Sequence, residues 1–219
     1  MIQWVYERAS AVLPLVVIAT DDTRIKDAVE EFGGKVVMTS DRHHTGTERC
    51  AEALELFSQT HPVDITHVIN IQGDEPLLKQ EHLETICGCF KEQETQIATL
   101  IQPLRQEEDL SNPNVVKVVV DKKFRALYFS RSPVPFIRKT QAELRPAKHP
   151  FYTHIGLYAF RAKALRELVQ LPGSPLEIAE SLEQLRWLEN GYTIQTVVTD
   201  QPALGVDTLE DLEKIRKLI

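Results

Sequence analysis

Residues 67–76 read His-Val-Ile-Asn-Ile-Gln-Gly-Asp-Glu-Pro, a short apolar run that passes directly into a polar turn. Such a run predicts a buried strand at 67–71 with the turn at its carboxyl end. Gly73 permits a tight turn or a close ligand approach, and Pro76 stiffens the exit. Ligands of open α/β sheets bind at the carboxyl ends of strands. We therefore expect a binding cleft here, with Asp74 projecting into its mouth.

The sequence around this turn alternates short apolar runs with amphipathic segments. LVVIAT at 15–20 is a near-continuous apolar run, which predicts a strand covered on both faces. Amphipathic helices begin after capping residues, at Asp21 or Asp22 and at Thr45. The predicted strands of the first half are 15–20, 36–38, 67–71 and 97–101. This alternation is typical of a parallel sheet with helices on both faces.

The second half of the chain is less regular. Its predicted strands are 115–120, 126–129, 155–160 and 193–199, and its predicted helices are 162–171, 174–190 and a last one from 208 to the C-terminus. Ser174-Pro175-Leu176-Glu177 supplies an N-cap, a proline at N1 and a glutamate at N3, so one helix should run to Asn190-Gly191. Four prolines within 132–150 predict an exposed excursion. The simplest organisation is one domain, residues 1–219, with an inserted arm.

Composition excludes several classes of function. The 25 Lys and Arg face 32 Asp and Glu without basic runs, so the charge pattern of a nucleic-acid-binding protein is absent. No run of about 18 apolar residues could span a membrane, and no signal-peptide core begins the chain, so we expect a cytoplasmic protein. Three scattered cysteines disfavour a disulfide framework. An acidic protein binds anionic small molecules through local cations or a metal ion, which directs attention to carboxylates.

Two aspartates stand at predicted strand ends. Asp74 is a hard oxygen ligand suited to Mg²⁺, although acids in such turns are often only solvated. Asp207 lies in Gly205-Val206-Asp207-Thr208, after a strand and before a helix N-cap, where the helix dipole alone would favour an acid. Carboxylates on neighbouring strand ends form a divalent-metal site for a nucleoside triphosphate, so the pair is more informative than either residue.

Further polar residues stand where a ligand could reach them. Arg49 ends Gly46-Thr47-Glu48-Arg49 at a helix start, which is a natural anion site. Three residues lie at strand ends or edges, and each, taken alone, is better explained as a surface or half-buried polar residue than as a ligand: Arg131, His154 and Tyr158. Glu183 and Gln184 flank the apolar stripe of the helix at 174–190, where they either reach a substrate or face solvent.

Together these residues resemble the 3-deoxy-manno-octulosonate (Kdo) cytidylyltransferase family over essentially the whole chain. The matching segments, in family order, are VVIATDD (16–22), GTER (46–49), NIQGDEP (70–76), NPNVVKVV (112–119), ALYFSRSPVP (126–135), HIGLYAFR (154–161), SPLEIAESLEQLRWLENG (174–191) and GVDTLEDLEKI (205–215). The related CMP-sialic acid synthetases are not expected to carry FSR, HIGLY and LEQLR together.

The resemblance implies a fold and a reaction. The fold is an α/β nucleotidyltransferase sandwich, like that of nucleotide-diphospho-sugar transferases, with a mixed, mostly parallel sheet. Residues at about 121–160 would form a dimerisation arm, which implies a homodimer. The reaction is CTP plus Kdo giving CMP-Kdo and pyrophosphate, for lipopolysaccharide synthesis, by in-line attack of the anomeric hydroxyl on the α-phosphorus.

The resemblance also implies roles for the residues named above. Mg²⁺ held by Asp74 and Asp207 would neutralise the phosphates and lower the pKa of the attacking hydroxyl, so no protein base is required. Arg49 and Arg131 would supply positive charge and cleft structure. By similarity, the sugar pocket is lined by Gln72, His154, Tyr158, Glu183 and Gln184.

One departure from the family concerns Met1-Ile2-Gln3-Trp4. The family begins with an apolar strand and a loop rich in Arg, Gly and Lys that ends in Gly-Lys-Pro-Met, and this sequence resembles a start at that methionine. Loss of a central strand leaves unpaired backbone groups and a slot in the core, so we expect either an unstable chain or a slot filled by another segment. The alternatives are a catalytically impaired homologue, or an enzyme for a related acid sugar (8-amino-Kdo or sialic acid).

Overall fold

The computed structural model describes residues 1–104, 107–138, 149–201, 206 and 213. The described strands are β1 Ile18–Thr20, β2 Val36–Met38, β3 His67–Asn70, β4 Ile97–Pro103, β5 Lys117–Val120, β6 Ala126–Ser130, β7 Tyr152–Arg161 and β8 Ile194–Val198. The described helices are α1 Ile2–Ser10, α2 Thr23–Glu31, α3 Gly46–Thr60, α4 Gln80–Gly88, the short 3₁₀ helix η1 Cys89–Lys91, α5 Glu107–Ser111, α7 Ala162–Leu168, α8 Pro175–Glu180 and α9 Glu183–Glu189.

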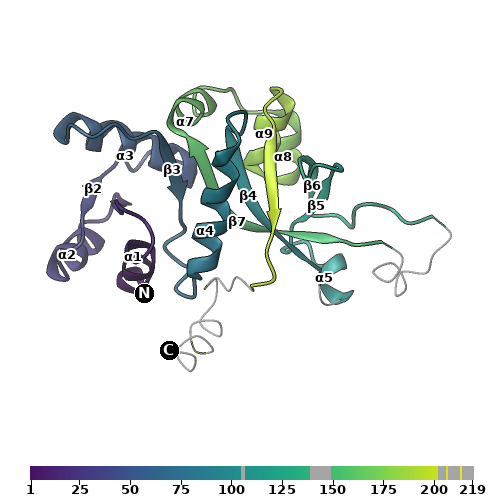
Figure 1. Ribbon diagram of the computed structural model, residues 1–219, viewed down its shortest axis with the longest axis horizontal. Coiled ribbons are helices and arrows are strands. Elements are labelled where there is room, and N and C mark those ends of the chain that lie inside the picture. Colours follow the sequence, from purple (N-terminus) through teal and green to yellow (C-terminus); the bar gives the residue numbers. More distant parts are fainter. Residues whose placement is uncertain (105–106, 139–148, 202–205, 207–212, 214–219) are drawn as a thin grey trace.

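The described strands form one large and one small sheet (Figure 1). In the large sheet the strand order is β6-β5-β7-β4-β8, and β3 pairs with the end of β7 that β5 leaves free. The small sheet consists of β1 and β2, which pair in parallel. The predicted mixed α/β sheet is therefore confirmed.

The sequence predicts a mixed, mostly parallel sheet. The directions of the strands agree with this prediction better than the pairings of neighbouring strands do. In the large sheet β3, β4, β5 and β8 run in one direction, whereas β7 and β6 run against them. Four of the five pairings among the described strands of this sheet are antiparallel: three involve β7, and the fourth joins β5 to β6. The remaining pairing in this sheet, between β4 and β8, is parallel.

Two apolar cores cover the two faces of the large sheet. On one face Ile97 and Ile101 of β4 pack with residues of α3, α7 and α9. On the other face Ala98 and Leu100 pack with residues of α1 and α4. The register shift between Thr99 and Leu100 places the extra residues on β7, so the alternation along β4 is not interrupted. Helices on both faces confirm the predicted layering.

Caps and turns explain where the helices begin and end. The Thr45 hydroxyl accepts the Glu48 N–H at 3.2 Å and starts α3, as predicted. Ser174 and Glu177 form the predicted capping box. The single helix expected over 174–190 is wrong, because Ser181 adopts a left-handed conformation with φ of 52° and divides it into α8 and α9. Helix α1 was not predicted from the sequence.

Residues 15–20 differ from the prediction. Only Ile18–Thr20 pairs as β1, and the residues before it run irregularly along a cavity between β1 and β3. No described segment fills this cavity, and the expectation of a slot filled by another segment stays a prediction. Helix α1 lies beside it and is tied to the body by Arg8, whose guanidinium donates to the Leu78 carbonyl at 3.1 Å.

The predicted arm, 121–160, overlaps the body of the molecule. Its last part forms β7, which lies inside the large sheet, whereas the described residues 131–138 extend away from it (Figure 1). The single domain and the dimerisation role of the arm stay predictions. The helix predicted from Thr208 lies outside the described residues. Among the described helices, none is long and apolar enough to cross a bilayer.

Candidate functional site

The start of α3 meets the carboxyl end of β3. A Cβ atom placed on Gly46 would lie 3.1 Å from Nδ2 of Asn70 and 3.4 Å from Nε2 of Gln72, so a larger residue would crowd both amides. Asn70 is buried and Gln72 is half-buried. The N–H groups at the start of a helix favour anions. This end of β3 therefore presents two amide side chains beside a helix N-terminus.

Arg49 of α3 ties the same corner to the small sheet. Its guanidinium donates to the Thr39 hydroxyl at 2.7 Å, to the Ser40 carbonyl at 3.3 Å and to the Asp21 carboxylate at 2.8 Å. Asp21 follows β1 and Thr39 follows β2. The carboxyl ends of β1, β2 and β3 thus gather around the start of α3. Arg49 positions these ends, which matches the cleft role predicted for it.

Asp74 lies half-buried in the turn after β3. Its backbone carbonyl accepts the Val206 N–H at 2.9 Å, which places Val206 at this turn. No hydrogen bond or ion pair from another residue in the described part of the chain occupies the Asp74 carboxylate, so its oxygens are available to a hard cation. Asp207 lies outside the described residues, and no cluster of three or more metal-binding side chains is found within them. The pairing of Asp74 with Asp207 stays a prediction.

Glu183 links α9 to the start of α3. Its carboxylate accepts the Thr45 hydroxyl at 2.9 Å and the Thr47 hydroxyl at 2.7 Å, and Arg186 donates to it at 3.1 Å. Burial raises the pKa of Glu183, and the two hydroxyls oppose that shift. The solvent-facing alternative for Glu183 is therefore wrong. Both carboxylate oxygens are occupied, so Glu183 is suited to positioning α3 rather than to accepting a proton.

The partners of Glu183 were missed by sequence reasoning. Thr45 had been assigned only as a helix cap, and Thr47 had been given no role beyond the GTER match. Arg186 is buried between Glu183 and Glu177, whose carboxylate lies 3.3 Å from its Nε. The sequence places Arg186 next to the apolar stripe of the predicted helix, and this position was the signal that could have indicated its burial. The contact between residues 45 and 183 is too distant in sequence for any local pattern to indicate.

His154, Tyr158 and Gln184 belong to one buried region at β7 and α9. His154 Nε2 lies 3.0 Å from the Thr99 hydroxyl, and its ring centroid is 5.1 Å from that of Tyr158. Burial lowers the pKa of His154 to about 3, so its ring is neutral near pH 7. Burial and the Glu183 carboxylate raise the pKa of Tyr158 well above its usual value, so its hydroxyl stays protonated.

Four buried donors in this region have no hydrogen-bond partner among the described residues. They are the Tyr158 hydroxyl, the Gln184 Nε2, the Arg186 Nε and the Trp187 Nε1, and Gln184 is only 5% exposed. A buried donor without a partner costs about 1–3 kcal/mol, so such groups mark places where a ligand or water belongs. The solvent-facing alternative for Gln184 is wrong.

Arg131 lies apart from this region, beside the α8–α9 junction. Its guanidinium donates to the backbone carbonyls of Glu180 at 2.8 Å, Pro113 at 2.9 Å and Ser181 at 3.3 Å. The Glu180 carboxylate accepts the Ser130 hydroxyl at 2.6 Å and the Arg131 N–H at 2.9 Å. Arg131 therefore holds β6 against α8, which agrees with a structural role. Its contact with a substrate stays a prediction.

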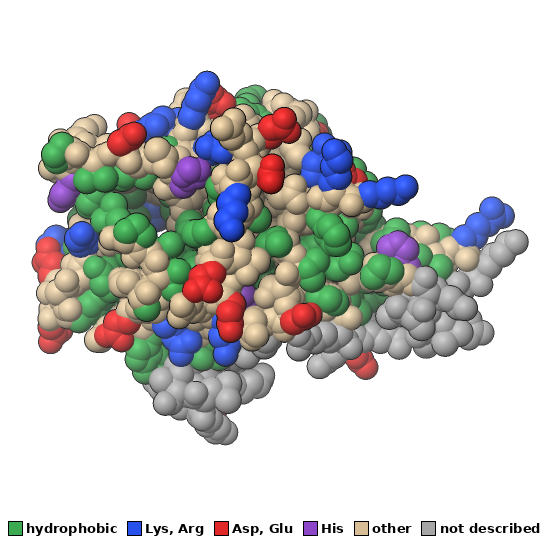
Figure 2. All heavy atoms as spheres, in the orientation of Figure 1, with side chains coloured by type: hydrophobic (Ala, Val, Ile, Leu, Met, Phe, Trp, Pro, Cys, Tyr) green, Lys and Arg blue, Asp and Glu red, His purple; other side chains and the backbone are tan. Residues whose placement is uncertain are grey.

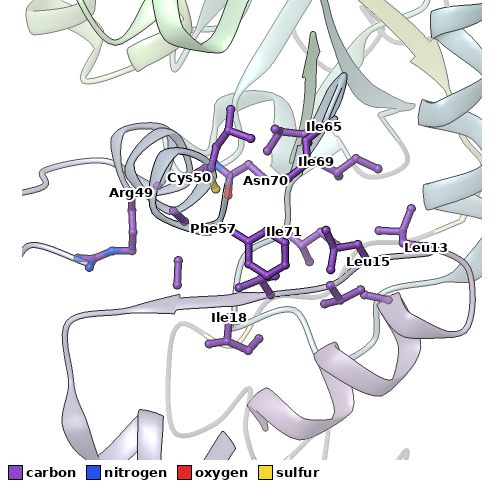
Figure 3. Close-up of a pocket in the computed structure, with 18 of the residues that line it drawn as sticks. Leu13, Leu15, Ile18, Arg49, Cys50, Phe57, Ile65, Ile69, Asn70 and Ile71 are labelled. Atoms are coloured by element: carbon purple, nitrogen blue, oxygen red, sulfur yellow. The ribbon is translucent and has the colours of Figure 1, made fainter. Parts of the chain in front are cut away.

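A cavity of about 780 Å³ adjoins the start of α3 (Figure 3). Its polar end is formed by Thr45, Gly46, Arg49, Asn70 and Gln72. Its remaining walls are mostly apolar and come from α1, the stretch before β1, α3 and β3. Burial, followed by the Glu183 charge, raises the pKa of the nearby Cys50 thiol to about 12, so this thiol is not a nucleophile at neutral pH.

Comparison with known proteins identifies close relatives. A sequence profile of the cytidylyltransferase family matches residues 1–196. The 3-deoxy-manno-octulosonate cytidylyltransferase of Parabacteroides distasonis is 54% identical over 219 residues, which cover 98% of this chain and 85% of the relative. The protein of the same name from Thermodesulfovibrio yellowstonii is 46% identical and covers 100% of this chain and 88% of the relative.

Two solved structures are also similar to this chain. CMP:2-keto-3-deoxy-manno-octonic acid synthetase in complex with CTP aligns with a TM-score of 0.88 and 40% identity, over 99% of this chain and 86% of that one. 4-Diphosphocytidyl-2C-methyl-D-erythritol synthase from Anaerococcus prevotii aligns with a TM-score of 0.57 and 13% identity, over 99% of this chain and 87% of that one. The second likeness concerns the fold alone.

Proposed function

Because this chain belongs to the cytidylyltransferase family, we propose that it transfers CMP from CTP to the anomeric hydroxyl of Kdo and releases pyrophosphate. The observation that carries the choice of sugar is the 54% identity, over nearly the whole chain, to a relative named for this reaction. In this proposal the product serves lipopolysaccharide synthesis, and the reaction takes place in the cytoplasm.

The geometry supports a division of the site into two parts. Near the turn after β3, the Asp74 carboxylate and the start of α3 suit the triphosphate of CTP and its cation. At β7 and α9, the unpaired donors of Tyr158 and Gln184 suit a molecule rich in acceptor oxygens, such as an acid sugar. Gln72, beside Gly46, lies at the polar end of the cavity that adjoins α3.

The reaction forms a bond between the anomeric oxygen and the α-phosphorus and breaks the bond from that phosphorus to the pyrophosphate oxygen. The hydroxyl proton passes to solvent. Asp74 and Asp207 would hold Mg²⁺, which neutralises phosphate charge and lowers the pKa of a nearby hydroxyl when bound. Glu183 accepts hydrogen bonds at both oxygens and His154 is hydrogen-bonded to Thr99, so these two groups position neighbouring residues rather than remove the proton.

A pyrophosphate-release assay tests the proposal. The protein receives CTP, Mg²⁺ and one of three acid sugars: Kdo, 8-amino-Kdo or sialic acid. We expect release with Kdo to exceed release with the others by at least about tenfold, and to require CTP rather than ATP, GTP or UTP. Preference for another acid sugar would replace Kdo as the substrate. No release with any sugar, from protein that still binds CTP, would favour the catalytically impaired alternative.

We also propose that the protein is a homodimer. Phe136, in the segment that extends after β6, is 73% exposed, and Ile178 of α8 is 74% exposed. Figure 2 shows hydrophobic side chains on the surface at the root of that segment. Exposed apolar groups of this size favour burial against a partner. Sedimentation at micromolar concentration should give a dimer, Phe136→Glu should weaken it, and a wild-type monomer would refute the proposal.

A further inference from the structure

The Glu183 carboxylate lies where the two parts of the site meet. On the triphosphate side it accepts the hydroxyls of Thr45 and Thr47, at the start of α3. On the sugar side, burial and then the Glu183 charge raise the pKa of the Tyr158 hydroxyl of β7. A change in the charge of Glu183 therefore affects both parts of the site.

The start of α3 depends on the ionised form of Glu183. The Thr45 hydroxyl accepts the Glu48 N–H at 3.2 Å as the helix cap, and donates to Glu183 at 2.9 Å. The Thr47 hydroxyl donates to the other carboxylate oxygen at 2.7 Å. Protonation of Glu183 would turn one of its oxygens into a donor and weaken one of these two bonds. The ionised carboxylate is the form that holds both threonines.

Two features of the fold oppose ionisation of Glu183. Burial raises the pKa of its carboxyl, and the negative charge of Glu177 on α8 raises it further. Two carboxylates that share a desolvated place repel each other, so an opposite charge must lie close to both of them. Among the described residues, Arg186 is the cation that contacts Glu183.

Arg186 of α9 joins three groups from its buried place. Its side chain is 8% exposed, and its guanidinium donates to Glu183 at 3.1 Å and to the Leu171 carbonyl at 3.2 Å. Its Nε forms an ion pair with the Glu177 carboxylate at 3.3 Å. Glu177 in turn accepts the Ser174 N–H at 3.2 Å in the capping box of α8. A planar guanidinium can serve several acceptors at once, which an ammonium group does less well.

From these contacts we propose that Arg186 is a positioning residue that keeps Glu183 ionised, so that both carboxylate oxygens hold the threonine hydroxyls at the start of α3. Arg186 is enclosed by its own partners, so it acts through Glu183 rather than by touching a substrate. For its effect on catalysis, this inference rests on the proposed function.

The other groups that face Glu183 leave this task to Arg186. Helix α3 presents two threonine hydroxyls and the thiol of Cys50, α8 presents Glu177, and β7 presents Tyr158. None of these groups is a cation near pH 7. The hydroxyls lower the pKa of Glu183 by donating to it, and Arg186 adds the one full positive charge among these described neighbours.

The first experiment measures the charge of Glu183 without catalysis. The full chain carries ¹³C at the glutamate side-chain carboxyls, and the Glu183 signal is the one missing from Glu183→Gln. A cation beside a carboxyl lowers its pKa by about 1–3 units. Arg186→Met should therefore raise the Glu183 pKa by at least about one unit in an NMR titration. Arg186→Lys keeps the charge and should raise it less than half as much.

The second experiment measures the pH profile of kcat/KM for CTP with saturating Kdo and Mg²⁺. In Arg186→Met the acid limb should move up by at least about one pH unit, because this ratio reports ionisations of the free enzyme. Arg186→Lys should keep the acid limb of the wild type. Loss of packing alone would lower the ratio equally at every pH.

Two further variants serve as controls. Arg166→Met removes the half-exposed ion pair with Glu55, at 2.6 Å between α7 and α3, and should change neither the NMR titration nor the pH profile. In a Glu183→Gln background, Arg186→Met should lower kcat/KM by at most about a further twofold, because residues that act through one another are not additive. A fully additive loss would assign Arg186 a role of its own and contradict the proposal.

A second variant decides the question if circular dichroism shows that Arg186→Met does not fold. Glu177→Gln removes the repulsion and leaves Arg186 to Glu183 alone, so it should lower the Glu183 pKa. A rise or no change in Glu177→Gln would overturn the proposal, and so would an unchanged Glu183 pKa in folded Arg186→Met.

The two experiments separate this inference from the proposed function. A raised Glu183 pKa in Arg186→Met with an unchanged pH profile would overturn the positioning role in the reaction. A wild-type protein that is inactive with CTP and every acid sugar would count against the proposed function alone, because the NMR titration still decides whether Arg186 keeps Glu183 ionised.

Discussion

The large and small sheets start from similar sequences and reach different degrees of order. IATLI in β4 is fully buried and pairs with β7 on one edge and β8 on the other. LVVIAT at 15–20 is as apolar, yet only Ile18–Thr20 forms a strand, with a partner on one edge. Both regions are apolar runs, so composition predicts a buried strand in each of them. In these two regions the run with a strand on each edge forms seven residues of strand, whereas the run with a described partner on one edge forms three.

The candidate site contains residues from both sheets. Asp74 and Asn70 follow β3 of the large sheet, whereas Asp21 and Thr39 follow the two strands of the small sheet. Helix α3 joins the two groups, through Arg49 on one side and Gly46 on the other. The order of the small sheet is therefore expected to affect ligand binding.

The largest expected effect concerns Asp74, on the large-sheet side. Asp74→Asn should lower turnover by at least about a thousandfold with the fold intact, because a metal ion contributes several kcal/mol to stabilising the transition state. Asp27→Asn, on the exposed face of α2, is the matched control and should leave turnover unchanged. Steady-state kinetics measures both. Near-normal turnover in Asp74→Asn would remove Asp74 from the metal site.

Hydrogen exchange compares the two sheets directly. The Ala19 amide of β1 should exchange at least about 100-fold faster than the Leu100 amide of β4, because the Ala19 N–H points away from β2, toward the edge of β1 that has no described partner strand, whereas β4 is paired on both edges. Mass spectrometry or NMR of the wild type at neutral pH gives both rates. Equal protection would mean that β1 has a second partner, and the contrast between the sheets would fail.

Glu183 tests the link between α9 and α3. Glu183→Gln should lower the free energy of unfolding by about 1–3 kcal/mol, because an amide cannot accept from both Thr45 and Thr47 while also facing Arg186. Glu94→Gln, at an exposed turn, should change it little. Urea denaturation measures both variants. A Glu183→Gln protein as stable as the wild type would show that this link is not needed to hold α3.

The most gradual expected effect is the acid sensitivity of His154. Its pKa in the fold is about 3, below its ordinary 6.5, so the unfolded chain takes up a proton that the folded one does not. Stability should be fully present above pH 6.5 and fall toward pH 3, by at most about 1.4 kcal/mol per pH unit. His154→Gln should make the slope shallower in denaturation between pH 4.5 and 7. An unchanged slope would mean that His154 is not kept neutral by burial.

Sequence reasoning reached the elements whose signals are local. The Thr45 cap, the β2 limits and the turn after β3 all follow from neighbouring residues. It failed where contacts between distant residues decide the outcome. The break at Ser181 coincides with Glu180 binding β6, and the role of Thr47 depends on Glu183. The antiparallel insertion of β7 depends on topology, which no single run of residues encodes.

The most direct test of the account is a ³¹P NMR time course of the wild-type protein with CTP, Mg²⁺ and Kdo. The account predicts that the three CTP signals decline together while one phosphodiester signal, from CMP-Kdo, and a pyrophosphate signal rise in equal amounts. Without Kdo, the ³¹P signals should not change with time. Loss of CTP to CMP without Kdo, or no new phosphodiester signal from folded protein that binds CTP, would contradict it.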